Sequence, residues 1–70
     1  MTFDEFMKKV DKKIQTVSGL GVHDFGDALW RDLYEDTENG EEATDEQIYE
    51  TLADADDIFA QMLEVQGIQL

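Results

Sequence analysis

Apolar residues recur every three or four positions along three stretches of the chain, the spacing that places side chains on one face of an α-helix. The first stretch opens at Thr2, three residues before Glu5, which is the capping-box pattern. Gly19 follows it and suits the left-handed conformation that ends many helices. We therefore predict a helix over about residues 3–17. Its apolar face comprises Phe3, Phe6, Met7, Val10, Ile14 and Val17.

The second stretch predicts a shorter helix over residues 24–35, with Phe25, Leu29 and Leu33 on its apolar face. Trp30 and Tyr34 lie beside this face, and two interpretations stay open for them. Either they pack in the core of the protein, or they are exposed together and anchor a partner or a homodimer. Tyrosine and tryptophan are among the residues favoured at binding hot spots.

The third stretch predicts a helix over residues 45–66, opened by a second capping box at Thr44 and closed by Gly67. An alternative is a break near Asp54, because this side chain could itself cap a new helix. The three stretches predict an all-α fold in a single domain of residues 1–70. A small three-helix bundle is the expected architecture, and a fourth short helix is the alternative.

The composition supports a folded core, since 41% of the 70 residues are apolar and four of them are Phe. Cysteine is absent, which excludes disulfides and thiolate metal sites. His23 is the only histidine, so no nucleophilic pair can form and we expect no enzymatic activity. No apolar run approaches the roughly 20 residues that a membrane span needs, and no signal peptide is recognisable. We expect a cytoplasmic protein without membrane contact.

Charge is the most unusual property of the sequence. Eighteen acidic residues against five basic ones give a formal net charge of −13, beyond the magnitude of about 2–8 that is usual for a small soluble domain. All four lysines lie before residue 14. Direct binding to nucleic acid is disfavoured, and a basic protein surface is the favoured partner.

Five acidic residues fall in one broad stripe of the third predicted helix, opposite its apolar face: Glu46, Glu50, Asp54, Asp57 and Glu64. On a continuous helix the first four step along the axis by roughly 6, 6 and 4.5 Å, which resembles the phosphates of one nucleic-acid strand in charge and pitch. The hypothesis is a non-enzymatic protein-binding module, in its sharpest form a nucleic-acid mimic that inhibits a basic host enzyme. The candidate partner-binding residues are Glu46, Glu50, Asp54 and Asp57, with Trp30 and Tyr34 as possible anchors.

Two alternatives come from other classes of function. Aligning Gly40 with the invariant glycine of an EF-hand places Glu35 at the first ligand position and Glu46 at the twelfth. The first ligand should be Asp, however, and the apolar eighth position is Glu42. Calcium binding through residues 35–46 therefore stays an alternative, and we expect no metal or cofactor. A structural homo-oligomer is the other alternative.

The segments "MTFDEFMKKVDKKI", "GL" at 19–20, "RDLYED" and "GEEA" resemble a family of very short acidic, uncharacterised proteins of bacteriophages and bacteria. The resemblance covers about residues 1–52. This chain departs from the pattern by inserting "TDEQ" and by extending through "ADADDIFAQMLEV". The resemblance implies a phage-associated accessory protein, and it carries over no activity and no catalytic residue.

Overall fold

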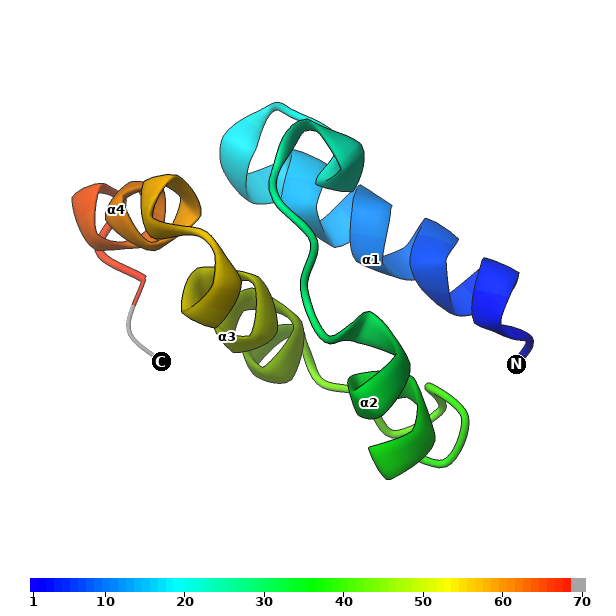
Figure 1. Ribbon diagram of the computed structural model, residues 1–70. Coiled ribbons are helices and arrows are strands. Elements are labelled where there is room, and N and C mark those ends of the chain that lie inside the picture. The colour runs from blue at the N-terminus through cyan, green and yellow to red at the C-terminus, as the bar shows by residue number, and fades with distance from the viewer. Residues whose placement is uncertain (69–70) are drawn as a thin grey trace.

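The computed structural model describes residues 1–68, and this part of the chain is all-helical without strands. The all-α prediction is therefore confirmed. The number of helices differs from the expected three, because the third predicted helix is divided into two (Figure 1). The elements are α1 (Phe3–Ser18), the short 3-10 helix η1 (Val22–Asp24), α2 (Trp30–Asp36), α3 (Asp45–Ala55) and α4 (Asp57–Val65).

Helix α1 has the limits that its caps predict. The Thr2 hydroxyl accepts a hydrogen bond from the Glu5 amide at 3.2 Å, and the Glu5 carboxylate accepts one from the Thr2 amide at 2.9 Å. At the other end, Gly19 is left-handed with φ 74° and donates its amide to Gln15. Both signals act within a few residues, so local sequence is sufficient to predict this helix.

The predicted helix over residues 24–35 is wrong in its first half. Residues 22–24 form the 3-10 turn η1, and α2 begins only at Trp30. Carboxylates bind the backbone amides of this region. Asp11 of α1 accepts the Val22 amide at 2.8 Å, and Asp24 accepts the Gly21 amide at 2.9 Å. These two bonds stabilise a turn against α1 just before the predicted helix, and inside its first half Asp56 accepts the Gly26 amide at 3.0 Å.

The third predicted helix breaks at Asp56, two residues after the predicted position. The backbone of Asp56 is extended, with φ −141°. This residue is both the C-cap of α3 and the N-cap of α4. Its carboxylate accepts hydrogen bonds from the amides of Ile58 and Phe59 at 2.9 and 3.1 Å. A continuous helix over 45–66 is therefore wrong, and Asp54 stays inside α3.

The closing signal of α4 is confirmed. Gly67 is left-handed with φ 74° and donates its amide to Glu64 at 3.1 Å. The next residue, Ile68, donates to Leu63 at 2.9 Å, which completes the Schellman pattern. Ile68 also packs against the core, so the hydrophobic contact of this motif is present.

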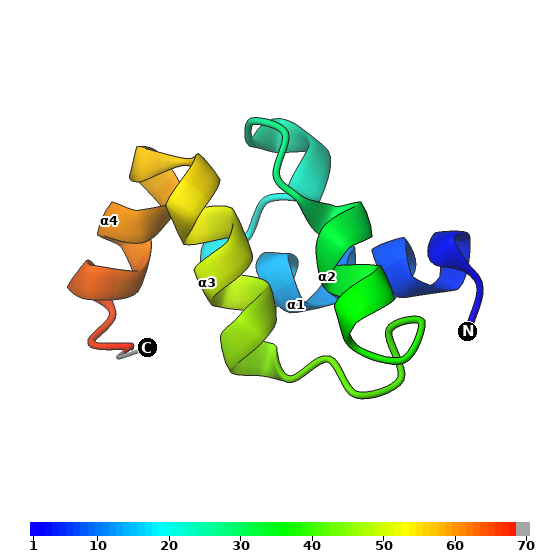
Figure 2. The same cartoon turned by 60° about the horizontal axis from the view of Figure 1, so that its bottom comes forward.

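Helix α1 is the central packing element, since it contacts η1, α2, α3 and α4. Figure 2 shows α4 turning back beside α3 after the break, and these two helices are also in contact. The core is one cluster drawn from every element. Its buried members are Phe6, Val10, Ile14, Val22, Trp30, Ala43, Ile48, Leu52, Phe59 and Leu63. No helix within residues 1–68 is long and apolar enough to cross a membrane.

The loop between α2 and α3 passes very close to α1. Gly40 is buried and left-handed, with φ 83°. A Cβ atom at this position would lie 2.5 Å from Cδ1 of Phe6, whose side chain is fully buried. The loop therefore requires glycine here both for its backbone conformation and for the space beside the Phe6 ring.

Asp56 joins three parts of the chain, because its carboxylate also accepts the Gly26 amide at 3.0 Å. The hydrogen bond from Gly26 is the largest cause that lowers the pKa of Asp56 below its ordinary value of 3.8. A lowered pKa in the folded state means stability that is present above pH 3.8 and is lost as the pH falls through the lower, folded-state pKa.

We expect Asp56→Ala to lower the melting temperature at pH 7, with a difference from the parent chain that shrinks as the pH falls below about 4. Circular dichroism melts at pH 7, 4 and 3 measure this. Asp54→Ala, which removes the same charge from an exposed position in α3, is the matched control. Equal melting temperatures for the two variants at pH 7 would contradict the role of Asp56 as a cap and tether.

Candidate functional site

Three of the predicted partner-binding residues form an exposed acidic row on α3. Glu46, Glu50 and Asp54 are spaced four residues apart and all are exposed. Their spacing places them on one stripe of the helix, about 6 Å apart along its axis. The buried residues of the same helix are Ile48 and Leu52, so the row faces away from the core.

The fourth predicted residue, Asp57, does not continue this row. It is the first residue of α4, after the break at Asp56. The predicted step of about 4.5 Å from Asp54 assumed one continuous helix and is wrong. Asp57 is exposed beside the corner of the two helices and adds charge there, without the regular pitch.

The two aromatic candidates are packing residues. Trp30 is only 7% exposed and belongs to the core. The Tyr34 ring packs against Phe3 and Phe6 with centroid distances of 5.3 and 5.5 Å, and its hydroxyl donates to the Met1 carbonyl at 2.7 Å. Of the two interpretations of this pair, packing is the one that these contacts support. The condition for joint anchors, exposure of both rings, is not met.

Three of the five basic side chains are engaged away from the exposed acidic row. Lys13 pairs with Asp45 at 3.3 Å, and Lys9 donates to the Ala43 carbonyl at 3.1 Å. Arg31 lies over the Phe3 ring, 4.2 Å from its centroid. The only other ion pair within residues 1–68 joins the amino group of Met1 to Glu41 and lowers the pKa of that carboxyl. The carboxylates of α2 and the acidic row of α3 form no ion pair in the described part of the chain.

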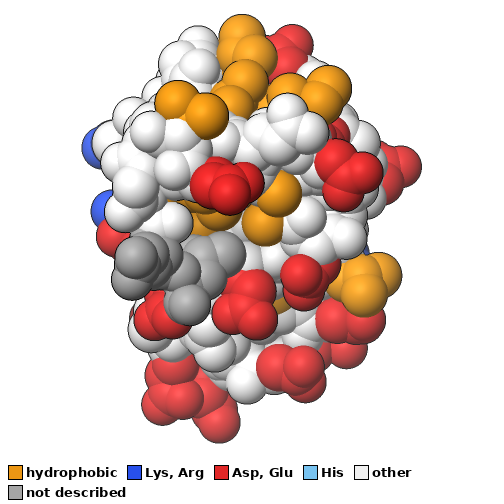
Figure 3. Space-filling model, turned by 90° about the vertical axis from the view of Figure 1, so that its left-hand side faces the viewer, with side chains coloured by type: hydrophobic (Ala, Val, Ile, Leu, Met, Phe, Trp, Pro, Cys, Tyr) orange, Lys and Arg blue, Asp and Glu red, His pale blue; other side chains and the backbone are white. Residues whose placement is uncertain are grey.

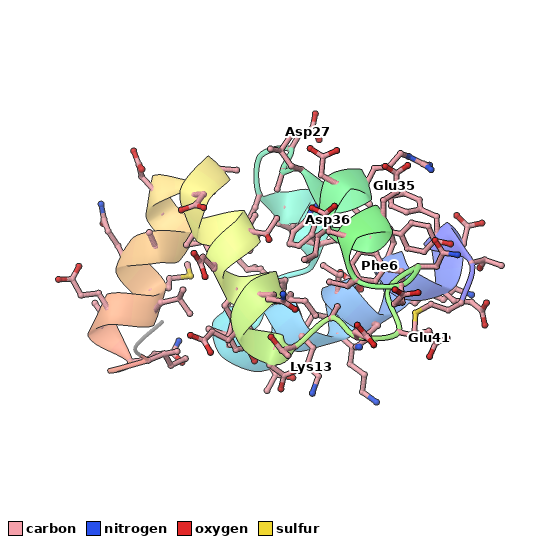
Figure 4. The ribbon with its side chains drawn as sticks, turned by 90° about the horizontal axis from the view of Figure 1, so that it is seen from below. Phe6, Lys13, Asp27, Glu35, Asp36 and Glu41 are labelled. Atoms are coloured by element: carbon pink, nitrogen blue, oxygen red, sulfur yellow. The ribbon has the colours of Figure 1, made fainter. Side chains whose placement is uncertain are left out.

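A groove lined by both apolar and acidic side chains lies between α2 and α3. Its volume is about 390 Å³. Figure 4 shows Asp36 on the side of α2 that faces α3, whereas Asp27 and Glu35 point outward. We call it the α2–α3 groove; its lining residues are Leu29, Asp32, Leu33, Asp36, Thr51, Asp54 and Ala55.

Most of this groove could not be recognised from the sequence. Leu29 was expected on the apolar face of a helix, yet it is 71% exposed at the N-cap of α2, which begins one residue after it. Asp32 and Asp36 are one turn apart on α2, a spacing visible in the sequence. Which helix this pair faces depends on the packing of α2 against α3, and no local signal reports that.

A second exposed apolar strip lies on α4. Ile58 and Val65 are 64% and 87% exposed, and Met62 lies in the shallow hollow between them. Figure 3, which views the α4 side, shows hydrophobic side chains gathered on the upper part of this face and carboxylates around and below them.

The loop proposed for calcium binding has its polar groups engaged or dispersed. Glu41 binds the Met1 amino group, and Glu35 points outward from α2 (Figure 4). Throughout the described residues, no group of three or more His, Asp or Glu side chains is placed to hold a metal ion. His23 is exposed in η1.

Comparison of the chain with protein-family models, with curated proteins and with solved structures gives no significant match. The resemblance to short acidic proteins of bacteriophages and bacteria therefore stays a prediction, and the site rests on its own geometry.

Proposed function

We propose that this protein is a non-enzymatic acidic module that binds a basic surface of another protein. The observation that carries the proposal is the exposed row of Glu46, Glu50 and Asp54, which forms no ion pair with any group of residues 1–68. Mutual repulsion of such carboxylates destabilises the compact state. A partner that supplies lysine and arginine side chains would relieve that repulsion. Charge complementarity therefore favours binding of a basic protein surface.

The sharpest form of the proposal is mimicry of nucleic acid. Carboxylates about 6 Å apart along α3 form a regular row of negative charges, as the phosphates of one strand do. A groove that binds DNA or RNA on a basic enzyme would accept such a row, and the protein would then act as an inhibitor of that enzyme. The resemblance to phage proteins supports a host enzyme as the target.

The test is capture of partners from a bacterial lysate at about 50 and 500 mM salt, where electrostatic contacts differ strongly. We expect proteins retained at low salt and released at high salt. The double variant Glu46→Lys/Glu50→Lys should lose them, with helix content by circular dichroism unchanged. An empty column with the parent chain would contradict the proposal.

The matched control is Glu35→Lys/Glu64→Lys, which makes the same change in net charge at exposed positions on α2 and α4. This control should retain most of the captured proteins. If both double variants lose them equally, only net charge matters and the α3 row has no specific role.

Self-association is the second candidate function, and the apolar strip of Ile58, Met62 and Val65 is the observation that favours it. The net charge of −13 opposes it, because two copies repel each other. Sedimentation at about 10 and 500 µM decides between a monomer and a dimer, since a dimer is populated by mass action.

A further inference from the structure

The α2–α3 groove brings apolar and acidic side chains together in one hollow of the surface. We propose that it seats a basic amphipathic segment of the partner protein, with one apolar side chain against the leucines and lysine or arginine on the aspartates. This inference rests on the proposed function, since it names the chemistry of the partner at one place on the acidic surface.

The apolar side chains of the groove provide the first half of the recognition. Leu29 is 71% exposed, and it lies beside the half-buried Leu33 and the exposed Ala55. An exposed leucine gains stability when a partner covers it, because apolar surface leaves water. The groove volume of about 390 Å³ lies within the range of ligand sites, which is enough for one large side chain and the backbone that carries it.

The aspartates of the groove provide the second half of the recognition. Asp32 and Asp36 stand one turn apart on α2, and Asp54 stands on α3. Within residues 1–68 none of the three takes part in an ion pair. Arg31, their basic neighbour in α2, lies over the Phe3 ring instead. Carboxylates placed in this way accept charge-assisted hydrogen bonds from lysine or arginine.

Charge favours a basic segment in the groove over a second copy of the chain or a nucleic acid. A second copy of the chain would bring a net charge of −13 toward the groove, and nucleic acid would bring its phosphates. A metal ion is disfavoured, because no three carboxylates among the described residues are placed to hold one. A segment that is both basic and apolar matches the acidic and the apolar side chains of the groove together.

The experiment uses a fluorescein-labelled peptide of twelve residues, designed as a helix with one leucine and an arginine one turn before and after it. A second peptide replaces the leucine with serine and keeps the charge. Fluorescence anisotropy with the full chain at about 50 mM salt gives both affinities. We expect the leucine peptide to bind about tenfold more tightly, since burial of one leucine accounts for such a ratio. Equal affinities, or no binding of the leucine peptide, would overturn the inference.

Two matched pairs of variants locate the binding. Leu29→Ser should weaken the leucine peptide about tenfold, whereas Ile58→Ser, an equally apolar change at the exposed strip of α4, should not alter it. Asp32→Asn/Asp36→Asn should weaken it more than Glu46→Gln/Glu50→Gln, although both remove two charges. Circular dichroism checks that each variant is folded.

The outcomes separate this inference from the proposed function. If the two charge pairs weaken the peptide equally and Leu29→Ser has no effect, the groove is not the seat. Capture from lysate that depends on Glu46 and Glu50 would then still support the acidic module. An empty lysate column with the parent chain, together with peptide binding at the groove, would instead contradict the proposed function while the peptide result for the groove stands.

Discussion

Gly40→Ala is expected to unfold much of the protein under conditions where the parent chain is folded. The left-handed conformation, φ 83°, is unfavourable for a residue with a Cβ atom by about 1–2 kcal/mol. The new atom would also lie 2.5 Å from Cδ1 and 3.1 Å from Cγ of Phe6. Phe6 is fully buried and cannot move away, so overpacking adds about 1–3 kcal/mol.

The sum, about 2–5 kcal/mol, approaches the roughly 3–5 kcal/mol that a single core of this size supplies. Urea unfolding followed by circular dichroism measures the loss. Gly19→Ala is the matched control, because Gly19 has a similar φ of 74° and no atom within 4 Å of a Cβ at that position. The control should lose only the backbone part. Equal losses would show that the contact with Phe6 contributes nothing.

Phe59→Ala is expected to have an effect of similar size, a loss of about 3–5 kcal/mol in the free energy of unfolding. Phe59 is fully buried in the first turn of α4. Its ring packs edge-on against Phe25 at 5.4 Å between centroids and against Tyr49 of α3 at 6.4 Å. Removing it leaves a cavity where α3, α4 and the 25–29 segment meet.

Phe25→Ala provides the comparison, because it removes the other ring of the same pair from a half-buried position. We expect a smaller loss in the free energy of unfolding, since Phe25 buries less apolar surface in the folded protein than Phe59 does and solvent can fill the gap that its removal leaves. Phe59→Leu should recover part of the stability by filling part of the cavity. A loss below about 1.5 kcal/mol for Phe59→Ala, typical of tolerated core swaps, would contradict the packing described here.

The fold could be predicted from the sequence where the signals are local. Thr2, Gly19 and Thr44 mark helix ends through groups at most four residues away, and each acts as expected. The errors arise where a distant group decides. Asp11 holds the Val22 amide across eleven positions, and the Gly26 amide binds Asp56 across thirty. The sequence suggested Asp54 as the cap, whereas the cap is Asp56, and the contact with Gly26 that holds Asp56 is not visible in the sequence.

The candidate site, too, could be predicted from the sequence only in part. Helical periodicity was sufficient to place Glu46, Glu50 and Asp54 on one exposed stripe, because a helix with a buried face has an opposite face in water. Periodicity could not decide whether Trp30 is buried. It also placed Leu29 in the core, since it did not reveal that α2 begins at Trp30. The α2–α3 groove follows from that late start and from the pairing of two helices.

The bond between Asp56 and Gly26 has a consequence for how the sequence can vary. The carboxylate holds a backbone amide, which every residue except proline possesses. Gly26 has no left-handed backbone, and a Cβ there would meet only an ordinary contact of 3.7 Å. Position 26 can therefore change its side chain while the path of the segment stays fixed. Variation at position 29, which lines the groove, could then retune what the groove accepts while the bond between Asp56 and residue 26 holds the backbone in place.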